Sequence, residues 1–255
     1  MLKRRLTIST LICLSLAICA CSFSGEDPNP RLSMFIGVDI SGSFINSGYF
    51  EDSIDFLANY IYAHLHGHGG LEVPSVLFVS SIGGARANEP KTFYPIQSFQ
   101  NKSVAEIEAK LLEIFPKEQS NPFTDYNAFF EQVALTIKNK NLVLRPISIV
   151  MVSDGIPDVK RNGKTDFGSL VVRPLEKLAR SVTIRLLYTN PVVGKSWQTE
   201  VRRSRVKIWT QDADVLVSWK DPKILLPSKP FPEQIRFFDW IKDNIDFGVR
   251  ARRVD

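Results

Sequence analysis

Nearly continuous apolar runs of six or seven residues predict buried strands in this chain. Leu32–Val38 is one such run, and Ile147–Val152 is another. Runs of this length are typical of strands that are covered on both faces of a parallel sheet. Further strands are expected at residues 76–79, 92–96 and 182–188, with one or two extended segments within 206–218. Pro95 has no N–H to donate, so the strand at 92–96 is expected at an edge of the sheet.

Between these runs, apolar residues recur every three or four positions and predict amphipathic helices. Residues 50–66 carry such a stripe, which consists of Ile54, Leu57, Ile61 and Leu65. Ser103 and Glu106 have the spacing of a capping box, which opens a second helix. Further helices are expected at residues 126–138, 174–180 and 195–204, and from Pro232 onward with Ile235, Phe238, Ile241 and Ile245 facing the core.

The alternation of strands and helices predicts the fold class. It indicates an α/β domain with a doubly wound, mostly parallel sheet that is flanked by helices on both faces, a Rossmann-like arrangement. In such sheets, ligands bind in the loops beyond the carboxyl ends of the strands. Functional residues are therefore expected in the loops that directly follow the predicted strands.

Oxygen-bearing side chains gather in three loops that meet at this edge of the sheet. They are Asp39, Ser41 and Ser43 after the first predicted strand, Thr124 before a predicted helix, and Asp154 after the central strand. None of the five offers sulfur or imidazole, and hard cations such as Mg²⁺ or Mn²⁺ prefer oxygen ligands. Because the set holds only two carboxylates, a bound cation can accept one more anionic ligand from outside.

The order Asp39-x-Ser41-x-Ser43, then Thr124, then Asp154 within Ser-Asp-Gly resembles the metal-ion-dependent adhesion site of von Willebrand factor A domains. The resemblance covers about residues 32–246. It implies that the hydroxyls contact the metal directly or nearly so and that the aspartates bind it directly or through water. It also implies a protein partner that supplies an acidic residue to the metal, and a binding module rather than an enzyme.

The first 20 residues predict a secretory leader. Lys3, Arg4 and Arg5 form a positive segment, and an uncharged apolar run follows from Leu6 to Ala20. This run is shorter than the roughly 20 apolar residues that span a membrane comfortably. Cys21 then fits the lipidated cysteine of a bacterial lipobox. An ordinary secretion signal and an uncleaved anchor are the alternatives.

These observations predict the domain organisation and the location of the protein. We expect a lipoprotein signal peptide at residues 1–20, a polar tether at 21–30 and a von Willebrand factor A-like domain at 31–255. The protein is expected in the bacterial cell envelope, held by its lipid anchor, and Ser22 favours the outer membrane where the cell has one. All three cysteines lie within the first 21 residues, so no disulfide is expected in the domain.

The charge balance of the chain does not predict a nucleic-acid partner. The formal net charge is +5, but the leader holds three basic residues and no acid, which leaves +2 for the remainder. A nucleic-acid interface needs a clustered excess of basic residues. Basic clusters at residues 202–207 and 250–253 are interpreted as solvated surface, with weak attraction to anionic lipid as the alternative.

Three other interpretations stay open. His64, His66 and His68 are expected at an exposed helix end, with zinc or copper binding as the alternative. Asp125 and Asp158 near the predicted site raise the alternative of a Mg²⁺-dependent hydrolase, although Asp125 is equally well placed to cap its helix. The third alternative is a scaffold subunit of an envelope complex that does not use its metal to capture a ligand.

Intact-mass measurement of the protein extracted from bacterial membranes tests the leader. We expect a chain that starts at Cys21 and carries the added mass of acyl groups. In a Cys21→Ala variant, we expect this mass to disappear and the leader to stay uncleaved. A mature chain that starts at Ser22, or one with an unmodified Cys21, would contradict lipidation.

Overall fold

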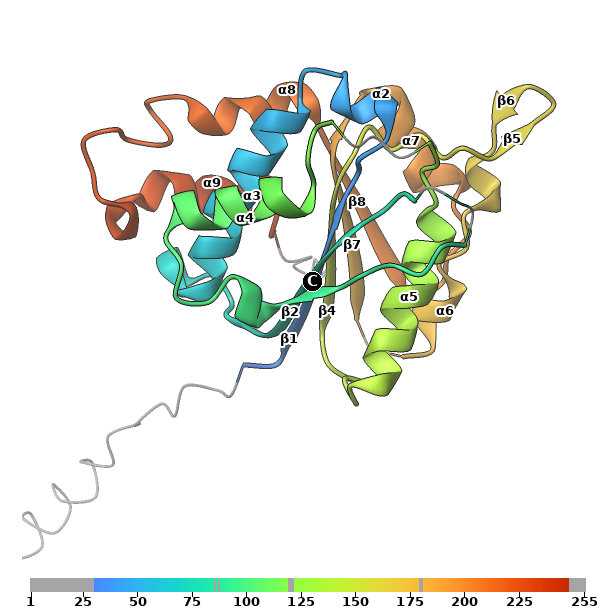
Figure 1. Cartoon of the computed structure of the whole chain (residues 1–255), viewed down its shortest axis with the longest axis horizontal. Helices are drawn as coiled ribbons and strands as arrows, with labels where there is room; N and C mark the ends of the chain where they lie inside the picture. The colour runs from blue at the N-terminus through green and yellow to red at the C-terminus, as the bar shows by residue number, and fades with distance from the viewer. Residues whose placement is uncertain (1–29, 85, 87, 119–121, 179–180, 248–255) are drawn as a thin grey trace, which may run out of the picture.

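The centre of the fold is a six-stranded sheet (Figure 1). Its strands are β1 (Leu32–Val38), β2 (Pro74–Ser81), β3 (Tyr94–Pro95), β4 (Ile147–Val152), β7 (Val182–Thr189) and β8 (Val206–Asp212). They lie in the order β3-β2-β1-β4-β7-β8. All neighbours pair in parallel except β2 and β3, which are antiparallel. The doubly wound, mostly parallel sheet that the sequence predicts is therefore confirmed.

Helices cover both faces of this sheet. They are α2 (Gly42–Ile45), α3 (Phe50–Leu65), α4 (Val104–Ile114), α5 (Tyr126–Asn139), α6 (Arg173–Glu176), α7 (Pro191–Glu200), α8 (Ala213–Leu216) and α9 (Ile235–Asn244). One core cluster joins a face of the sheet to α3, α4, α8 and α9, and a second joins the other face to α5, α6 and α7. The alternation along β1 decides the face: Met34 and Ile36 pack into the first cluster and Phe35 into the second.

The computed structural model describes residues 30–84, 86, 88–118, 122–178 and 181–247. The predicted signal peptide, Cys21 and all but the last residue of the predicted tether lie outside these ranges. Within them, no helix combines the length and the apolar character that crossing a membrane requires.

Several elements match the sequence-based predictions closely. The strands at 32–38 and 147–152 have the predicted bounds, and Pro95 lies in the antiparallel edge strand. The capping box is present, since Ser103 and Glu106 each accept a hydrogen bond from the other's backbone N–H. Local side-chain pattern decides these features, so they can be predicted from the sequence.

Other predictions were wrong in detail. The helix expected at 174–180 ends at Glu176, and the one expected at 195–204 begins at Pro191 because the Asn190 side chain caps it. Of the one or two extended segments expected within 206–218, one is present as β8, and the residues after it form α8 and a 3-10 turn. Ile235 was predicted to face the core but is 64% exposed, because Phe237 and Phe238 occupy the buried face of α9.

A bulge at the end of β7 turns an extra side chain toward α3. The register with β8 shifts between Leu187 and Thr189, and Tyr188 adopts a φ of 71° in the left-handed region. Leu187 and Tyr188 therefore pack into the same core cluster instead of alternating. The Tyr188 hydroxyl donates to the Asp52 carboxylate at 2.7 Å, which links β7 to α3.

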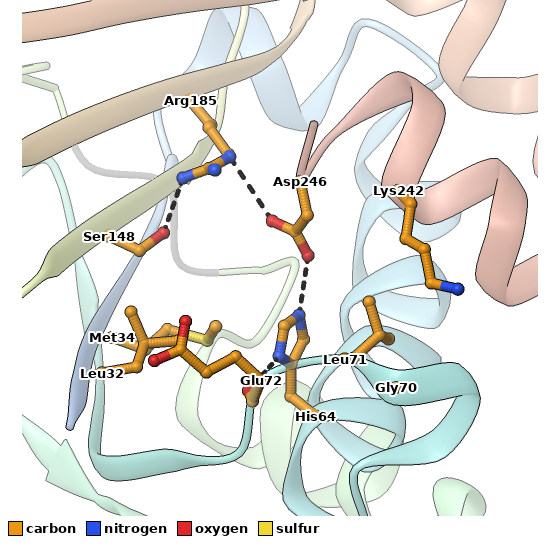
Figure 2. A pocket seen from close by; sticks show the side chains of 10 residues that line it. All are labelled: Leu32, Met34, His64, Gly70, Leu71, Glu72, Ser148, Arg185, Lys242 and Asp246. Atoms are coloured by element: carbon orange, nitrogen blue, oxygen red, sulfur yellow. Dashed lines mark hydrogen bonds and ion pairs between the residues drawn. The ribbon is translucent and has the colours of Figure 1, made fainter. Parts of the chain in front are cut away.

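Charged side chains from distant parts of the chain meet at the amino end of the sheet, beside a cavity of about 250 Å³ (Figure 2). Asp246 follows α9, and its carboxylate lies 2.8 Å from His64 Nε2 of α3 and 3.4 Å from Arg185 Nε of β7. The Tyr60 hydroxyl also donates to Asp246, and Arg185 donates to the Ser148 hydroxyl. This anchor network, made of Tyr60, His64, Ser148, Arg185 and Asp246, ties the end of α9 to α3 and to the sheet.

The anchor network lowers the pKa of the Asp246 carboxyl. Burial alone raises this pKa, but the charge and hydrogen bond of His64, the charge of Arg185 and the hydrogen bond of Tyr60 together outweigh burial. A carboxyl with a depressed pKa in the folded state stabilises the fold above its unfolded pKa of about 3.9. That stabilisation is lost as the pH falls through the folded pKa.

We predict that Asp246→Asn lowers the free energy of unfolding by about 3 kcal/mol at pH 7, because it leaves the largely buried Arg185 guanidinium without its acidic partner. The variant should also lose less stability than the wild type when the pH falls below about 4. Urea unfolding at several pH values measures both effects.

Asp239→Asn on the surface of α9 is the matched control. Its carboxylate is 57% exposed and pairs with Lys242 at 3.1 Å, so its loss should change stability by no more than about 0.5 kcal/mol. Equal effects of Asp239→Asn and Asp246→Asn would show that the anchor network does not hold α9.

Candidate metal centre

The register of β1 and β4 brings the first two loops of the predicted site together. Val38 and Val152 are partners at the ends of these parallel strands, so Asp39 and Ser153 begin their loops side by side. The Asp39 N–H donates to the Val152 carbonyl at 3.0 Å, and the Ser153 N–H donates to the Leu187 carbonyl at 3.1 Å. The sheet therefore continues by one residue into each loop and holds both loops in position.

The loop after β1 gathers three of the predicted ligands. Asp39 Oδ1 accepts a hydrogen bond from the Ser41 N–H at 2.8 Å, and the Ser41 and Ser43 hydroxyl oxygens lie 3.1 Å apart. The Ser41 hydroxyl also caps α2 by accepting from the Phe44 N–H. The backbone turn thus places one carboxylate and two hydroxyls in a single small loop.

Ser153 joins the two loops and was missed as a site residue by the sequence analysis. Its hydroxyl donates to Asp39 Oδ2 at 2.5 Å, hydrogen-bonds the Tyr126 hydroxyl at 2.6 Å and accepts from the Gly155 N–H at 3.0 Å. The Asp154 carboxylate accepts from the Ile156 N–H at 3.0 Å. The position of Ser153 directly after a central strand was the available indication of its role.

Thr124 lies at the start of α5 and is 5% exposed. Its N–H donates to the Asp158 carboxylate, which belongs to the loop after β4. The preceding Phe123 carbonyl accepts from the Gly84 N–H at 3.1 Å. Asp125 caps α5 through the Ala128 N–H at 2.9 Å, as the capping interpretation predicts. The structure therefore connects Thr124 to the loop that carries Asp154.

The Asp39 carboxyl is fully buried, and its pKa is raised to about 6. Burial is the largest cause, the hydrogen bond from Ser153 opposes it, and the negative charge of Asp154 raises the pKa further. Among the described residues, neither Asp39 nor Asp154 forms an ion pair with a basic side chain. A buried carboxylate without a counter-charge is costly, and a cation would relieve that cost.

The chemistry of the donor set fits a hard divalent cation. Carboxylate and hydroxyl oxygens suit Mg²⁺ or Mn²⁺, and the described part of the chain has no cluster of three or more His, Cys, Asp or Glu residues placed to hold a metal. The residues that would hold the ion are Asp39, Ser41, Ser43, Thr124 and Asp154. These five side chains come from three loops at the carboxyl edge of the sheet.

The three histidines do not share one environment. His64 is 2% exposed and belongs to the anchor network, so the prediction of an exposed helix end was wrong for this residue. His66 is exposed, its Nδ1–H donates to the Tyr62 carbonyl at 2.9 Å, and its ring stacks on that of His68, with ring centroids 5.4 Å apart. The Tyr62, His66 and His68 rings lie against one another, and the His68 ring also stacks on Phe238 of α9.

A recess of about 230 Å³ lies beside the loop after β1, between the end of β2 and the end of α4. Ile40, Lys91 and Phe115 are among its lining residues. The Lys91 ammonium donates to the Gly83 carbonyl at 3.0 Å. Burial lowers the pKa of Lys91, against the opposing charges of Asp125 and Glu89. The recess adds a basic group next to the loop that carries Thr124.

Comparisons with known proteins find likeness among solved structures only. No family model matches the sequence, and no curated protein matches it. The SpRpn10 VWA domain is 15% identical, with a TM-score of 0.43 over 75% of this chain and 96% of that chain. The manganese-loaded TRAP protein of Plasmodium vivax is 14% identical, with a TM-score of 0.46 over 76% and 73%.

Proximal thread matrix protein 1 from the mussel byssus, in a structure with a zinc-occupied MIDAS motif, is 12% identical. Its TM-score is 0.42 over 83% of this chain and 46% of that chain. The chain thus spans less than half the length of the byssus protein.

We predict that Gly155→Ala lowers the free energy of unfolding by about 3 kcal/mol. Gly155 has a φ of 80°, and a Cβ there would lie 2.8 Å from Val193 Cγ1 and 3.0 Å from Leu186 and Thr189 side-chain carbons. Gly163→Ala is the matched control, because its φ of 77° is similar but no atom lies within 4 Å.

The control should cost about 1 kcal/mol, which is the backbone term alone. Thermal and urea unfolding of both variants separate backbone strain from the packing clash. Equal losses in the two variants would mean that the loop after Asp154 can move away from Val193, and that the site is less rigid than its contacts indicate.

Proposed function

We propose that this is a lipid-anchored protein of the bacterial cell envelope whose domain holds Mg²⁺ or Mn²⁺ and captures a protein partner through an acidic residue. The observation that carries the proposal is the Asp39 carboxylate, which is fully buried beside Asp154 and has no basic partner among the described residues. A cation in contact with both loops would balance this charge.

The arrangement of the donors supports a site with an open position. The protein supplies two carboxylates, Asp39 and Asp154, and three hydroxyls, Ser41, Ser43 and Thr124. These leave a divalent cation with a net attraction for another anion, since hydroxyl oxygens add no charge. A glutamate or aspartate of a partner protein would satisfy that attraction. Binding strength then depends on the metal as well as on the surrounding surface.

Two other functions make different predictions. A Mg²⁺-dependent hydrolase at the same site would turn over a generic phosphoester such as p-nitrophenyl phosphate when the metal is present. An envelope scaffold that does not use its metal would still recover its partner from membranes after Asp39→Asn. Binding through the metal predicts no turnover and loss of partner recovery in that variant.

We predict that saturating Mg²⁺ or Mn²⁺ raises the melting temperature of the full chain in detergent by about 5–10 °C. A ligand that binds only the native state adds about 2.7 kcal/mol at 100 times its Kd, and 1 kcal/mol corresponds to about 2–4 °C in a domain of this size. Asp39→Asn should abolish the rise. Differential scanning calorimetry with metal and with EDTA measures both.

In EDTA, the Asp39→Asn protein should melt no lower than the wild type, because an amide replaces an unpaired buried charge while keeping its shape. Asp125→Asn is the control, since an asparagine also caps a helix and the metal response should persist. A wild type that melts at the same temperature with metal and with EDTA would contradict the metal centre. So would an Asp39→Asn variant that still responds.

A further inference from the structure

A basic hairpin stands next to the candidate metal centre. Its strands are β5 (Lys160–Arg161) and β6 (Lys164–Thr165), which pair antiparallel. Asn162 and Gly163 connect them with φ values of 51° and 77°, as a tight two-residue turn requires. The hairpin projects from the body of the molecule at the same end of the sheet as α2 (Figure 1).

The base of the hairpin is fixed to the metal centre. The Asp158 carboxylate accepts from the Thr124 N–H, and the Asp166 N–H donates to the Val159 carbonyl at 2.9 Å. Lys160 is only two residues beyond Asp158, which keeps their Cα atoms within about 7 Å of each other. The hairpin therefore has a defined position relative to Thr124.

Three basic side chains on the hairpin are free of acidic partners. Lys160, Arg161 and Lys164 are exposed, and none forms an ion pair within the described part of the chain. The nearby Asp158 carboxylate is directed back to Thr124. Asp166 at the base also makes no ion pair with them. The positive charge of the hairpin is thus available to an outside ligand.

Exposed apolar side chains border the same edge. Phe123 directly precedes Thr124 and is 41% exposed, while Ile156 and Val159 lie in the loop after Asp154 and are 40% and 45% exposed. Apolar side chains on an otherwise charged surface are typical of a protein contact. They would contribute nothing to the binding of a free inorganic anion.

We propose that the hairpin is a second contact for the protein partner and selects a segment in which several acidic residues follow one another. The inference rests on the proposed function, because one carboxylate of that segment goes to the metal and the next ones meet Lys160, Arg161 and Lys164. Exposed charge pairs of this kind steer association and set partner choice more than they add affinity. An apolar residue between the acids would contact Phe123, Ile156 and Val159.

Two blocked peptides test the inference with the full chain in detergent and saturating Mg²⁺. The first is Gly-Asp-Leu-Asp-Asp-Glu-Gly, and the second, Gly-Asp-Leu-Asn-Asn-Gln-Gly, keeps only one carboxylate. Fluorescence anisotropy should show that the wild type binds the first peptide about tenfold more tightly than the second at low salt. High salt should reduce this difference.

The triple variant Lys160→Gln/Arg161→Gln/Lys164→Gln should bind both peptides equally, with an unchanged melting temperature. The control variant Arg202→Gln/Arg205→Gln/Lys207→Gln removes the same charge from exposed positions at the amino end of β8, away from the metal edge. It should keep the tenfold preference. EDTA should weaken binding of both peptides to every variant.

Several outcomes would overturn the inference. They are a preference that survives in the hairpin variant, a preference lost equally in the control variant, and a metal-loaded wild type that does not bind the first peptide. In the last case, the calorimetric response to metal still decides the proposed metal centre independently. Displacement of the first peptide by short-chain phosphatidylserine at lower concentrations than the peptide itself needs would make the hairpin a lipid contact instead.

Discussion

The parallel register between β1 and β4 is the constraint on which the candidate centre depends. It places Asp39 and Ser153 next to each other at the carboxyl edge, where the Ser153 hydroxyl donates to the buried carboxylate. The remaining candidate ligands are positioned relative to this pair. The turn after β1 places Ser41 and Ser43, and Asp154 directly follows Ser153 in the sequence. Thr124 is held through its hydrogen bond to Asp158. A shift of one residue in this register would separate the two loops and move the core-facing side chains of the shifted strand to the opposite face of the sheet.

The two ends of the sheet each hold a carboxylate, but their surroundings shift its pKa in opposite directions. At the amino end, Arg185 and His64 surround Asp246, and its pKa is lowered. At the carboxyl end, Asp39 has hydroxyl and amide donors but no basic partner in the described structure, and its pKa is raised. A fixed cationic side chain makes the first site a permanent structural link. At Asp39 the counter-charge would come from an exchangeable ion, and a contact that depends on a metal requires such an arrangement.

The parts of the fold and of the candidate site that depend on local sequence pattern could be predicted. Contacts between residues far apart in the sequence could not. The bounds of β1 and β4 followed from apolar runs that end at polar residues, and the candidate ligands followed from their places after those strands. The four residues of α8 are too few to show a helical period, and in α9 two adjacent phenylalanines compete with Ile235 for the buried face. The hairpin at 160–165 has no apolar alternation, and only Asn162-Gly163 indicated its turn. The hydrogen bonds and ion pairs of the anchor network join residues that lie 37 to 186 positions apart, for which no local pattern exists.

The anchor network also bears on the order in which the molecule is completed during synthesis. All six strands of the central sheet, and with them His64 and Arg185, the two basic partners of Asp246, leave the ribosome before Asp246 does. Until that residue emerges, the largely buried guanidinium of Arg185 on β7 lacks its counter-ion, which disfavours packing of the α3 layer against the sheet. We therefore expect a chain that has not yet added Asp246 to hold its α3 layer less firmly and to be more accessible to chaperones and proteases.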